Sequence, residues 1–332
     1  MMETQTAYKI AASSPAKLNL TFDIVGGLPD GYHEVVTILQ AIDLEDQLLF
    51  EFVPADEFRV DIEINYVGDP GNIPTDDSNL VAKALNLFHD HVSADPNYAI
   101  KVTMEKRIPI TAGMGGGSGN AAAALLAMNN RFGHAVPEVD MHSLAARLGA
   151  DVPFFLQGGT QIGLKRGDML SPTPLCGTFH FVIARPHGLS IATTWIYEAY
   201  DRYIETASNK ENLEHPDLFR CKDALADHDL YLAQTAFGNV FEPVVFSKFP
   251  GLSLVRDRLL DLGCLSAHLT GSGPTMYGLA PDKETAHKVV KALYVDQTKR
   301  HQRWRRESAL KLDLWASESV DHGARIMFVK QN

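Results

Sequence analysis

Alternating apolar and polar residues define the first element that the chain predicts, a strand over residues 18–25. In a strand, successive side chains point to opposite faces. The apolar face holds Leu18, Leu20, Phe22 and Ile24, and the polar face holds Lys17, Asn19, Thr21 and Asp23. Lys17 and Asn19 therefore project together from the start of the polar face, although a lysine that simply faces solvent is the more common case.

Further short alternating or apolar runs predict strands at residues 35–52, 100–104, 179–184, 268–278 and 325–330. Residues 35–52 are expected to contain two strands that separate near residues 44–46, and residues 268–278 contain a glycine turn between two strands. The sequence Asp30-Gly31 is a strong hairpin signal after the first strand.

Helical spacing of apolar residues predicts helices at residues 80–88, 139–148, 190–200, 252–262 and 282–294. Residues 76–79 supply capping side chains for the first of these helices, and Gly149 suits the end of the second. Strand–helix alternation with antiparallel hairpins predicts an α+β fold. The turn-rich residues 167–177 are the expected boundary, which gives a first domain over residues 1–172 and a second over residues 173–332.

Composition and charge narrow the function classes. The chain has 332 residues and a net charge of −11, which argues against nucleic-acid binding. No apolar run approaches the ~20 residues of a membrane span, and the polar N-terminus lacks a signal core. Three scattered cysteines suit reduced thiols, so we expect a cytoplasmic protein. The charged residues 206–229 and the basic residues 298–307 have no assigned role, and the basic segment is expected to be a solvated face.

A glycine-rich loop at residues 109–120 carries the main chemical signal. Five glycines lie between Gly113 and Gly119, and alanines and leucines follow, so a helix is expected to begin near Ser118 or Asn120. Such a loop at a helix N-terminus is typical of a phosphate site, although a tight turn would also use glycine. No lysine follows the glycines as a Walker loop requires, and the match to the dinucleotide pattern is weak.

Two other features allow both a functional and a structural interpretation. Tyr32 and His33 could stack on a flat ring and hydrogen-bond to its edge, or they could simply decorate the start of a strand. Asp151 lies between a helix end and an apolar stretch that is expected to be a strand. There it could form a turn or act as a catalytic base.

Three separated motifs then resemble those of the GHMP small-molecule kinases. They are residues 15–20 (PAKLNL), residues 109–118 (PITAGMGGGS) and residues 269–275 (LTGSGPT), in the family's order and spread over the chain. Residues 30–33 (DGYH), 41–46 (AIDLED) and 149–154 (GADVPF) narrow the resemblance. They are similar to the members that phosphorylate the 2-hydroxyl of 4-diphosphocytidyl-2-C-methyl-D-erythritol in non-mevalonate isoprenoid synthesis.

The resemblance implies a fold and a set of site residues. The implied first domain is like the second domain of ribosomal protein S5, and the implied second domain is ferredoxin-like. Asp151 would be the base and Lys17 would assist it. The substrate, a cytidyl diphosphate, would be bound by Asn19, Tyr32, His33 and Tyr197. ATP would be bound by Asn79, Leu80, Lys106, Gly113, Gly115, Gly116, Gly117, Ser118, Gly119 and Asn120.

The resemblance also implies Mg²⁺, with unknown ligands, and a monomer or homodimer that needs no nucleic acid or membrane. Two positions depart from the family pattern, because Gly119 stands in place of a usual serine and Thr111 in place of a usual glycine. Two alternatives stay open. One is a GHMP kinase for another alcohol such as mevalonate or homoserine, and the other is a non-catalytic nucleotide-binding relative.

Overall fold

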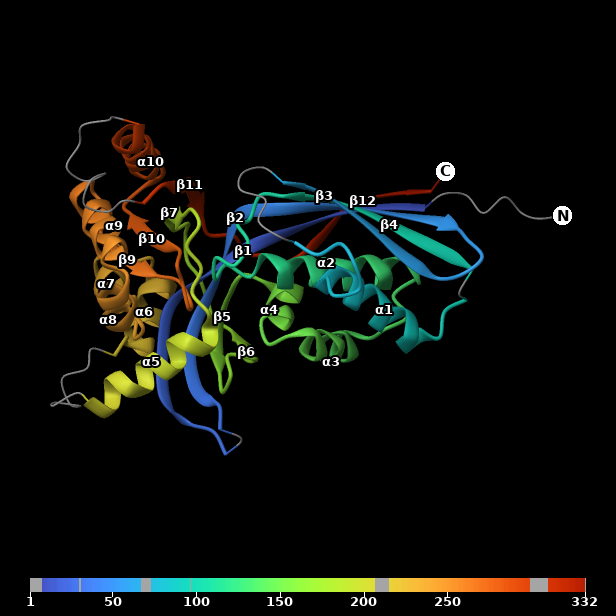
Figure 1. Ribbon diagram of the computed structural model, residues 1–332, viewed down its shortest axis with the longest axis horizontal. Coiled ribbons are helices and arrows are strands. Elements are labelled where there is room, and N and C mark those ends of the chain that lie inside the picture. Colours follow the sequence, from blue (N-terminus) through green and yellow to red (C-terminus); the bar gives the residue numbers. More distant parts are fainter. Residues whose placement is uncertain are drawn as a thin grey trace.

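The protein is described by a computed structural model that covers residues 8–29, 31–66, 73–95, 97–206, 215–298 and 310–331. Two sheet-and-helix units lie side by side along the longest axis (Figure 1). The expected two-unit α+β fold is confirmed. The basic segment around residues 299–306 lies outside the described residues, and so do residues 207–214 of the charged stretch.

The first unit is built on a sheet with the strand order β12-β1-β2-β4-β3. Its strands are β1 (Tyr8–Gly27), β2 (His33–Pro54), β3 (Arg59–Tyr66), β4 (Tyr98–Lys106) and β12 (Arg325–Gln331). The expectation of two strands within residues 35–52 was wrong, because β2 is continuous. Its partner register shifts between Pro15 and Ala16, where Asp43 and Leu44 are the extra residues on β2. The break near residues 44–46 is therefore a β-bulge and no chain reversal.

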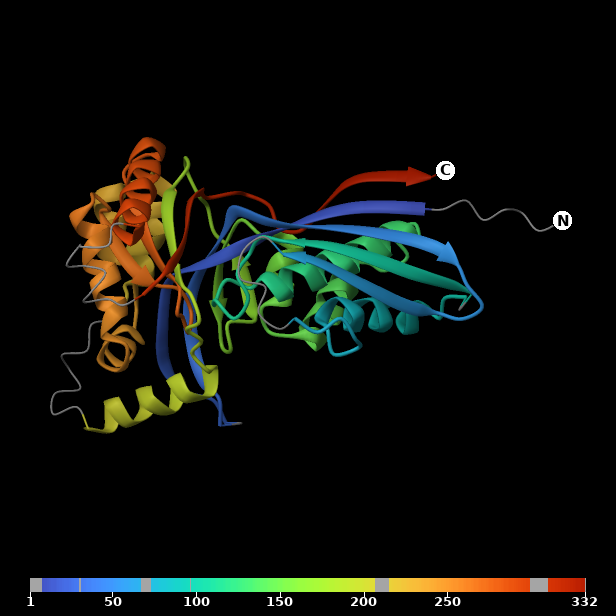
Figure 2. The same cartoon turned by 45° about the horizontal axis from the view of Figure 1, so that its top comes forward.

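Helices cover one face of this sheet (Figure 2). They are α1 (Leu80–Val92), α2 (Gly116–Arg131), α3 (Glu138–Leu148) and α4 (Val152–Gln157), and the hairpin β5 (Thr160–Leu164) and β6 (Met169–Pro172) follows them. The apolar stretch after Asp151 was expected to be a strand, and this was wrong, because it forms α4. Pro153 lies in the first turn of α4, where a missing N–H costs nothing.

The second unit contains a four-stranded antiparallel sheet in the order β11-β7-β10-β9. Its strands are β7 (His180–Pro186), β9 (Ser266–Leu269), β10 (Met276–Ala280) and β11 (Leu312–Glu318). The helices of this half are α5 (Thr193–Thr206), α6 (Leu218–Asp227), α7 (Leu230–Ala236), α8 (Glu242–Lys248), α9 (Pro250–Asp261) and α10 (Lys283–Thr298). The short β8 (Gly238–Asn239) pairs with β1.

The two units share buried structure. Leu18 and Leu20 of β1 pack in one apolar cluster with Phe181 and Tyr277 of the second sheet, and the Tyr277 hydroxyl donates to the Leu20 carbonyl at 3.0 Å. The expected strand near residues 325–330 forms, but it pairs with β1 in the first sheet and not with the second sheet. The division after residue 172 stays a prediction. Within the described residues, no helix combines the length and apolarity that a membrane crossing requires.

Candidate active site

The glycine loop lies between β4 and α2. Gly113 and Gly115 take φ angles of +75° and +72°, which favour glycine. Helix α2 was expected to begin near Ser118 or Asn120, but it begins at Gly116 with Gly115 as its N-cap. In the described part of the chain, no side chain caps this end, and no acidic residue lies in the first turn. The first amides, which have no partner inside a helix, are therefore left to bind an anion.

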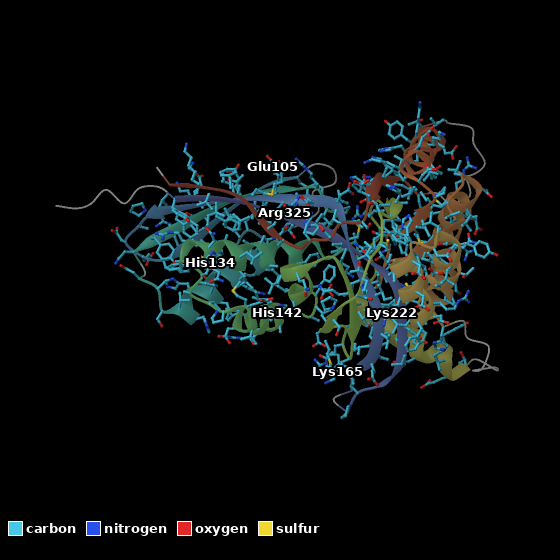
Figure 3. The ribbon with its side chains drawn as sticks, turned by 180° about the vertical axis from the view of Figure 1, so that it is seen from behind. Glu105, His134, His142, Lys165, Lys222 and Arg325 are labelled. Carbon is cyan, nitrogen blue, oxygen red and sulfur yellow. The ribbon has the colours of Figure 1, made fainter. Side chains whose placement is uncertain are left out.

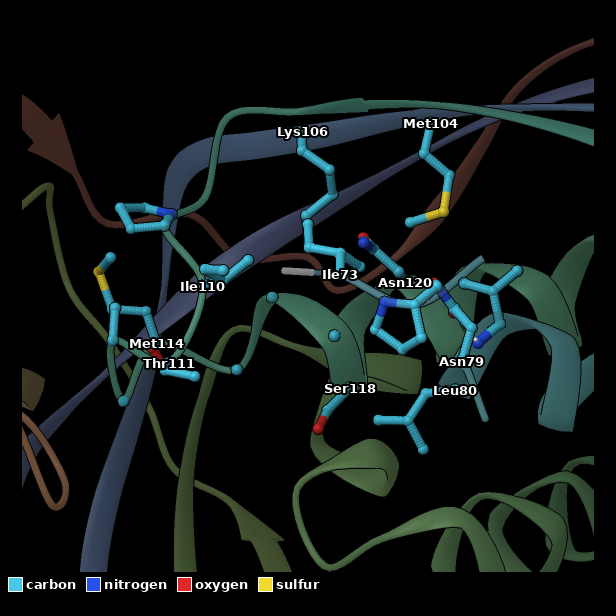
Figure 4. A pocket seen from close by; sticks show the side chains of 18 of the residues that line it. Ile73, Asn79, Leu80, Met104, Lys106, Ile110, Thr111, Met114, Ser118 and Asn120 are labelled. Carbon is cyan, nitrogen blue, oxygen red and sulfur yellow. Dashed lines mark hydrogen bonds between the residues drawn. The ribbon is translucent and has the colours of Figure 1, made fainter. Parts of the chain in front are cut away.

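A cavity of about 380 Å³ opens beside this loop (Figure 4). Apolar side chains that could hold a flat ring come from Ile73, Pro74, Leu80, Met104 and Ile110. The predicted nucleotide residues that line it are Asn79, Leu80, Lys106, Gly113, Gly115, Gly116, Gly117, Ser118 and Asn120. Sequence analysis missed Ile73, Pro74 and Met104, which lie outside the motifs, and Ile110, which lies within residues 109–118 but was given no role. Gly119 does not line this cavity.

The polar side chains of this cavity differ in whether they already have ion-pair or hydrogen-bond partners. Lys106 is buried in an ion pair with Asp46, whose other oxygen accepts the Ile108 N–H at 2.9 Å. Asn79 caps α1 by accepting the Val81 N–H at 2.8 Å, and its amide group donates to a backbone carbonyl at 2.6 Å. By contrast, Asn120 is 1% exposed, and neither polar atom of its side chain has a partner among the described residues. Asn120 is therefore the side chain of this cavity that lacks the partners a ligand could supply.

A second cavity, of about 470 Å³, lies next to the first and shares Thr111, Gly113 and Gly115 with it. Besides the shared Gly113 and Gly115, four predicted site residues line the second cavity: Lys17, Asn19, Asp151 and Tyr197. They come from β1, from the start of α4 and from α5, so the fold assembles this cavity from both units. We call the first the loop cavity and the second the acceptor cavity.

Lys17 is held at the junction between the two cavities. Its ammonium donates to Asn19 Oδ1 at 2.6 Å, and Asn19 donates to Thr37 at 2.8 Å. Lys17 is 5% exposed, and burial lowers its pKa, whereas the charge of Asp151 raises it. Asp151, which lies far along the chain from Lys17, therefore acts on the Lys17 ammonium, as the resemblance implies.

Asp151 stands at the N-cap position of α4, yet its side chain makes no capping hydrogen bond. It is exposed. Burial raises the pKa of Tyr197 to about 12, and the charge of Asp151 contributes to that rise. Asp151 lines the same cavity as Lys17 and Tyr197, and its charge raises the pKa of both. This arrangement favours the placed base over the turn former.

The third motif, residues 269–275, borders the acceptor cavity. Thr270 Oγ1 accepts the N–H of Asn19 at 2.9 Å. A Cβ atom on Gly113 would lie 2.9 Å from the Thr270 carbonyl oxygen, and a Cβ atom on Gly271 would lie 3.1 Å from Asn19 Oδ1. Both glycines thus allow a close approach that a side chain would block. The three motifs, far apart in sequence, meet here.

The predicted base-binding residues lie around Tyr197, at the edge of the acceptor cavity. The rings of His33 and Tyr197 are 4.7 Å apart, and His33 Nε2 lies 2.7 Å from an Asp201 carboxylate oxygen. Tyr32 is 58% exposed and has the guanidinium of Arg166 over its ring. Tyr197 lines the acceptor cavity, whereas Tyr32 and His33 do not. Sequence analysis missed both Arg166 and Asp201, because only the fold brings them to these rings.

The two departures from the family pattern have structural counterparts. A Cβ atom on Gly119 would lie 2.1 Å from Ser14 Oγ and 3.2 Å from the Phe155 ring, so position 119 faces packed protein and not a cavity. The backbone of Thr111 takes φ +49°. This left-handed conformation is unfavourable for a β-branched residue and natural for the usual glycine.

Comparisons of the sequence and of the structure with known proteins both match this chain to GHMP kinases. The family model for the GHMP kinases N terminal domain matches residues 79–159, and the model for the GHMP kinases C terminal matches residues 221–296. The chain is 34% identical to the 4-diphosphocytidyl-2-C-methyl-D-erythritol kinase of Thermosynechococcus vestitus, over 96% of this chain and 99% of that protein. It is 32% identical to the enzyme of the same name from Listeria monocytogenes, over 86% of this chain and 92% of the relative.

Solved structures show the same architecture. A crystal structure of 4-(cytidine 5'-diphospho)-2C-methyl-D-erythritol kinase aligns with a TM-score of 0.71 and 28% identity, over 93% of this chain and 99% of that one. A homoserine kinase from Cytophaga hutchinsonii aligns with a TM-score of 0.71 and 20% identity, over 98% of both chains. At that identity, the second likeness concerns the fold alone.

Proposed function

The chain belongs to the GHMP kinase family, and we propose that it transfers the γ-phosphoryl group of ATP to the 2-hydroxyl of 4-diphosphocytidyl-2-C-methyl-D-erythritol, in the cytoplasm. The observation that carries this proposal is the junction of the two cavities. Lys17 and Asp151 line one cavity, and Gly113 and Gly115 line both that cavity and the other. An alcohol and a terminal phosphate placed in them would therefore meet at Gly113 and Gly115.

In this proposal, the loop cavity binds ATP. The apolar residues Leu80 and Met104 hold the adenine, and the amides of the first turn of α2 bind the phosphates. Asn120, which is buried and has no side-chain partner among the described residues, hydrogen-bonds to the nucleotide. Lys106 remains in its ion pair with Asp46. Its main contribution is therefore to form a polar part of the cavity lining, because its charge is already paired.

In the acceptor cavity, Asp151 takes the proton of the 2-hydroxyl, and the oxygen attacks the γ-phosphorus as ADP leaves. Lys17 lies beside both groups and stabilises the negative charge on the transferring phosphoryl. Its hydrogen bond to Asn19 fixes its position, so the site needs little reorganisation during the step. Most of the catalysis is thus positioning and charge stabilisation.

The cytidyl group lies at the edge of the acceptor cavity, where Tyr32 and Tyr197 offer aromatic faces and His33 offers a ring edge. These residues favour a substrate with a flat base over mevalonate or homoserine, which have none. A non-catalytic nucleotide-binding relative would need neither Lys17 nor Asp151, and both face the same cavity here.

Mg²⁺ supplies charge neutralisation on the phosphates when it is bound. The described residues hold no cluster of three or more His, Cys, Asp or Glu side chains that could bind a metal ion by themselves. Ser118, which lines the loop cavity, would help to hold the ion when it is bound together with ATP.

A direct test measures ADP release by the purified protein with ATP and Mg²⁺, in parallel with the cytidyl diphosphate alcohol, mevalonate and homoserine. We expect turnover with the cytidyl substrate and none above background with the other two. Faster turnover of mevalonate or homoserine would identify the acceptor as another alcohol. ATP binding without turnover of any alcohol would identify a non-catalytic relative.

A further inference from the structure

Alternate residues of β7 face the first unit, and this row ends in a buried arginine. Phe181 and Ile183 pack in the apolar cluster that joins the two units, whereas Val182 and Ala184 belong to a different cluster. Arg185 continues the row of Phe181 and Ile183 by one position, because side chains alternate between the faces of a strand. It is 5% exposed. The strand therefore directs one charged side chain towards the first unit.

The part of the first unit that meets this row is the start of the glycine loop. Glu105 marks the end of β4 in Figure 3, and the loop segment follows directly after that strand. Ile108 and Ala112 pack in the cluster that joins the two units, and Ile110 lies between them in the chain. Nη2 of Arg185 donates to the Ile110 carbonyl at 3.4 Å. The second unit is thus hydrogen-bonded to the backbone of the loop.

Strand β11 holds the same arginine from its other side. Asp313 is the direct cross-strand neighbour of Arg185, and one of its carboxylate oxygens lies 3.7 Å from Arg185 Nη1. The other carboxylate oxygen lies 2.5 Å from His187 Nε2, so the carboxylate is itself restrained. Arg185 therefore connects a carboxylate of the second sheet to a carbonyl of the glycine loop.

The carbonyl that Arg185 holds belongs to the peptide unit that sets the φ angle of Thr111. The Ile110 carbonyl and the Thr111 nitrogen lie in one plane, and φ is the rotation about the bond from that nitrogen to the Thr111 Cα. At φ +49°, Thr111 is in a conformation that is unfavourable for a β-branched residue. A hydrogen bond that fixes this plane opposes relaxation of Thr111. Thr111 lines both cavities, whereas Arg185 lines neither.

We propose that Arg185 is a positioning residue for ATP binding: from the second unit, it holds the peptide between Ile110 and Thr111 in the conformation that shapes the glycine loop. The inference rests on the function proposed above for the loop cavity. It accounts for how the loop keeps its shape with a threonine in place of the usual glycine. It also makes the second unit contribute to a nucleotide site that is lined only by the first.

The test measures ATP affinity by calorimetry, together with kcat and KM for ATP with the cytidyl substrate. In Arg185→Met, we expect the ATP dissociation constant and KM to rise roughly 10-fold, which is the loss expected for one hydrogen bond from a charged group. The value of kcat should stay within about threefold, because Arg185 touches neither cavity. Arg185→Lys should fall between the native protein and Arg185→Met, because it keeps the charge beside Asp313 and loses the planar fork.

Arg258→Met is the matched control. Arg258 pairs with Asp296 at 2.9 Å within the second unit, and neither residue lines either cavity. The variant therefore removes a partly buried arginine from an ion pair without touching the loop, and we expect ATP affinity to match that of the native protein.

Two further measurements connect the effect to Thr111. In a Thr111→Gly background, Arg185→Met should raise the ATP dissociation constant only about twofold, because glycine adopts positive φ without steric cost. Hydrogen exchange of the backbone amides of residues 110–116 needs neither substrate nor turnover. It should become faster in Arg185→Met and stay at the native rate in Arg258→Met.

Three results would overturn the inference: native ATP affinity in Arg185→Met, an equal loss of affinity in Arg258→Met, or an equal effect of Arg185→Met with and without Thr111→Gly. If Arg185→Met does not fold, Arg185→Lys replaces it in each comparison. A native protein that binds ATP and does not phosphorylate the cytidyl alcohol would refute the proposed function, and ATP affinity would still decide the role of Arg185. If the native protein binds no ATP, unchanged hydrogen exchange in Arg185→Met would refute the contact as well.

Discussion

The loop cavity and the acceptor cavity share three residues but are built in opposite ways. The loop cavity is lined by residues 73–120, a single stretch of the first unit, and it presents backbone amides and apolar side chains. The acceptor cavity is lined by residues that range from Lys17 to Gly273, and it presents the charged groups Lys17, Asp151 and Arg166. The comparison teaches that binding of the nucleotide depends on local backbone shape, whereas chemistry and acceptor choice depend on contacts between distant segments.

The largest expected effect comes from removing the charge of the acceptor cavity at Asp151. Asp151→Asn should lower kcat by roughly 10²- to 10⁴-fold, because the base acts in the transition state. ATP affinity should stay nearly unchanged, since Asp151 does not line the loop cavity. Steady-state kinetics and ATP titration measure the two effects. Parallel loss of ATP binding and folding would instead make Asp151 a structural residue.

A second variant, Gly115→Ala, alters the backbone of the glycine loop and leaves the charged side chains of the acceptor cavity in place. In Gly115→Ala, the new Cβ atom would lie 2.5 Å from the Phe155 ring, at a φ of +72°. We expect a loss of about 2–4 kcal/mol from the left-handed conformation and the clash together, with weaker ATP binding. Gly133→Ala is the matched control, because Gly133 has φ +67° and nothing within 4 Å of the added atom. Chemical unfolding and ATP titration of both variants check this, and equal losses would remove the clash from the explanation.

A smaller effect is expected on stability when the buried ammonium is removed. Burial lowers the pKa of Lys17 in the folded protein below its ordinary value of 10.5. At a pH between the lowered pKa of the folded protein and the ordinary pKa of the unfolded chain, the unfolded chain therefore binds more protons than the folded one. Stability therefore rises with pH through that window. Lys17→Met should abolish turnover and raise the free energy of unfolding by about 1 kcal/mol at pH 7.

This gain should shrink as the pH rises towards 10.5, because the native lysine then loses its proton. Urea unfolding at a series of pH values measures the difference. A variant that is less stable than the native protein at pH 7 would mean that the hydrogen bond from Lys17 to Asn19 outweighs the cost of burial.

The smallest effect concerns the backbone where both cavities meet. Thr111→Gly removes a β-branched side chain from φ +49°. We expect a gain in stability of up to about 1 kcal/mol, because the relief of strain exceeds the entropy that glycine adds to the unfolded chain. Turnover should change little. A loss of stability by urea unfolding would show that the threonine side chain contributes more than its conformation costs.

The sequence correctly predicted the features that depend on residues close together in the chain. The polar face with Lys17 and Asn19, the cap at Asn79 and the glycine loop all follow from spacing within a few residues. The bulge in β2 was taken for a chain break, because a register shift depends on the partner strand. The start of α2 was placed too late, because serine and asparagine are the usual caps and here Gly115 takes the position.

The candidate site shows the same difference between features set by neighbouring residues and features set by distant ones. Lys17 and Asp151 were expected together only through a family resemblance, since nothing local links residues so far apart in sequence. The approach of Arg166 to Tyr32 and of Asp201 to His33 depends on tertiary packing, and no motif contains these pairs. The roles of the predicted site residues stay predictions until the variants above are measured.

The pairing of β12 with β1 has a consequence for how the protein is made. Tyr8 lies opposite Gln331 in this pair, so β1 leaves the ribosome long before its partner strand β12. Until β12 has been made, β1 has an open edge that can recruit other chains. The nascent chain is therefore exposed to aggregation while the residues between β1 and β12 are translated. A circular permutant that joins these neighbouring ends through a short linker should shorten the time for which this edge is open.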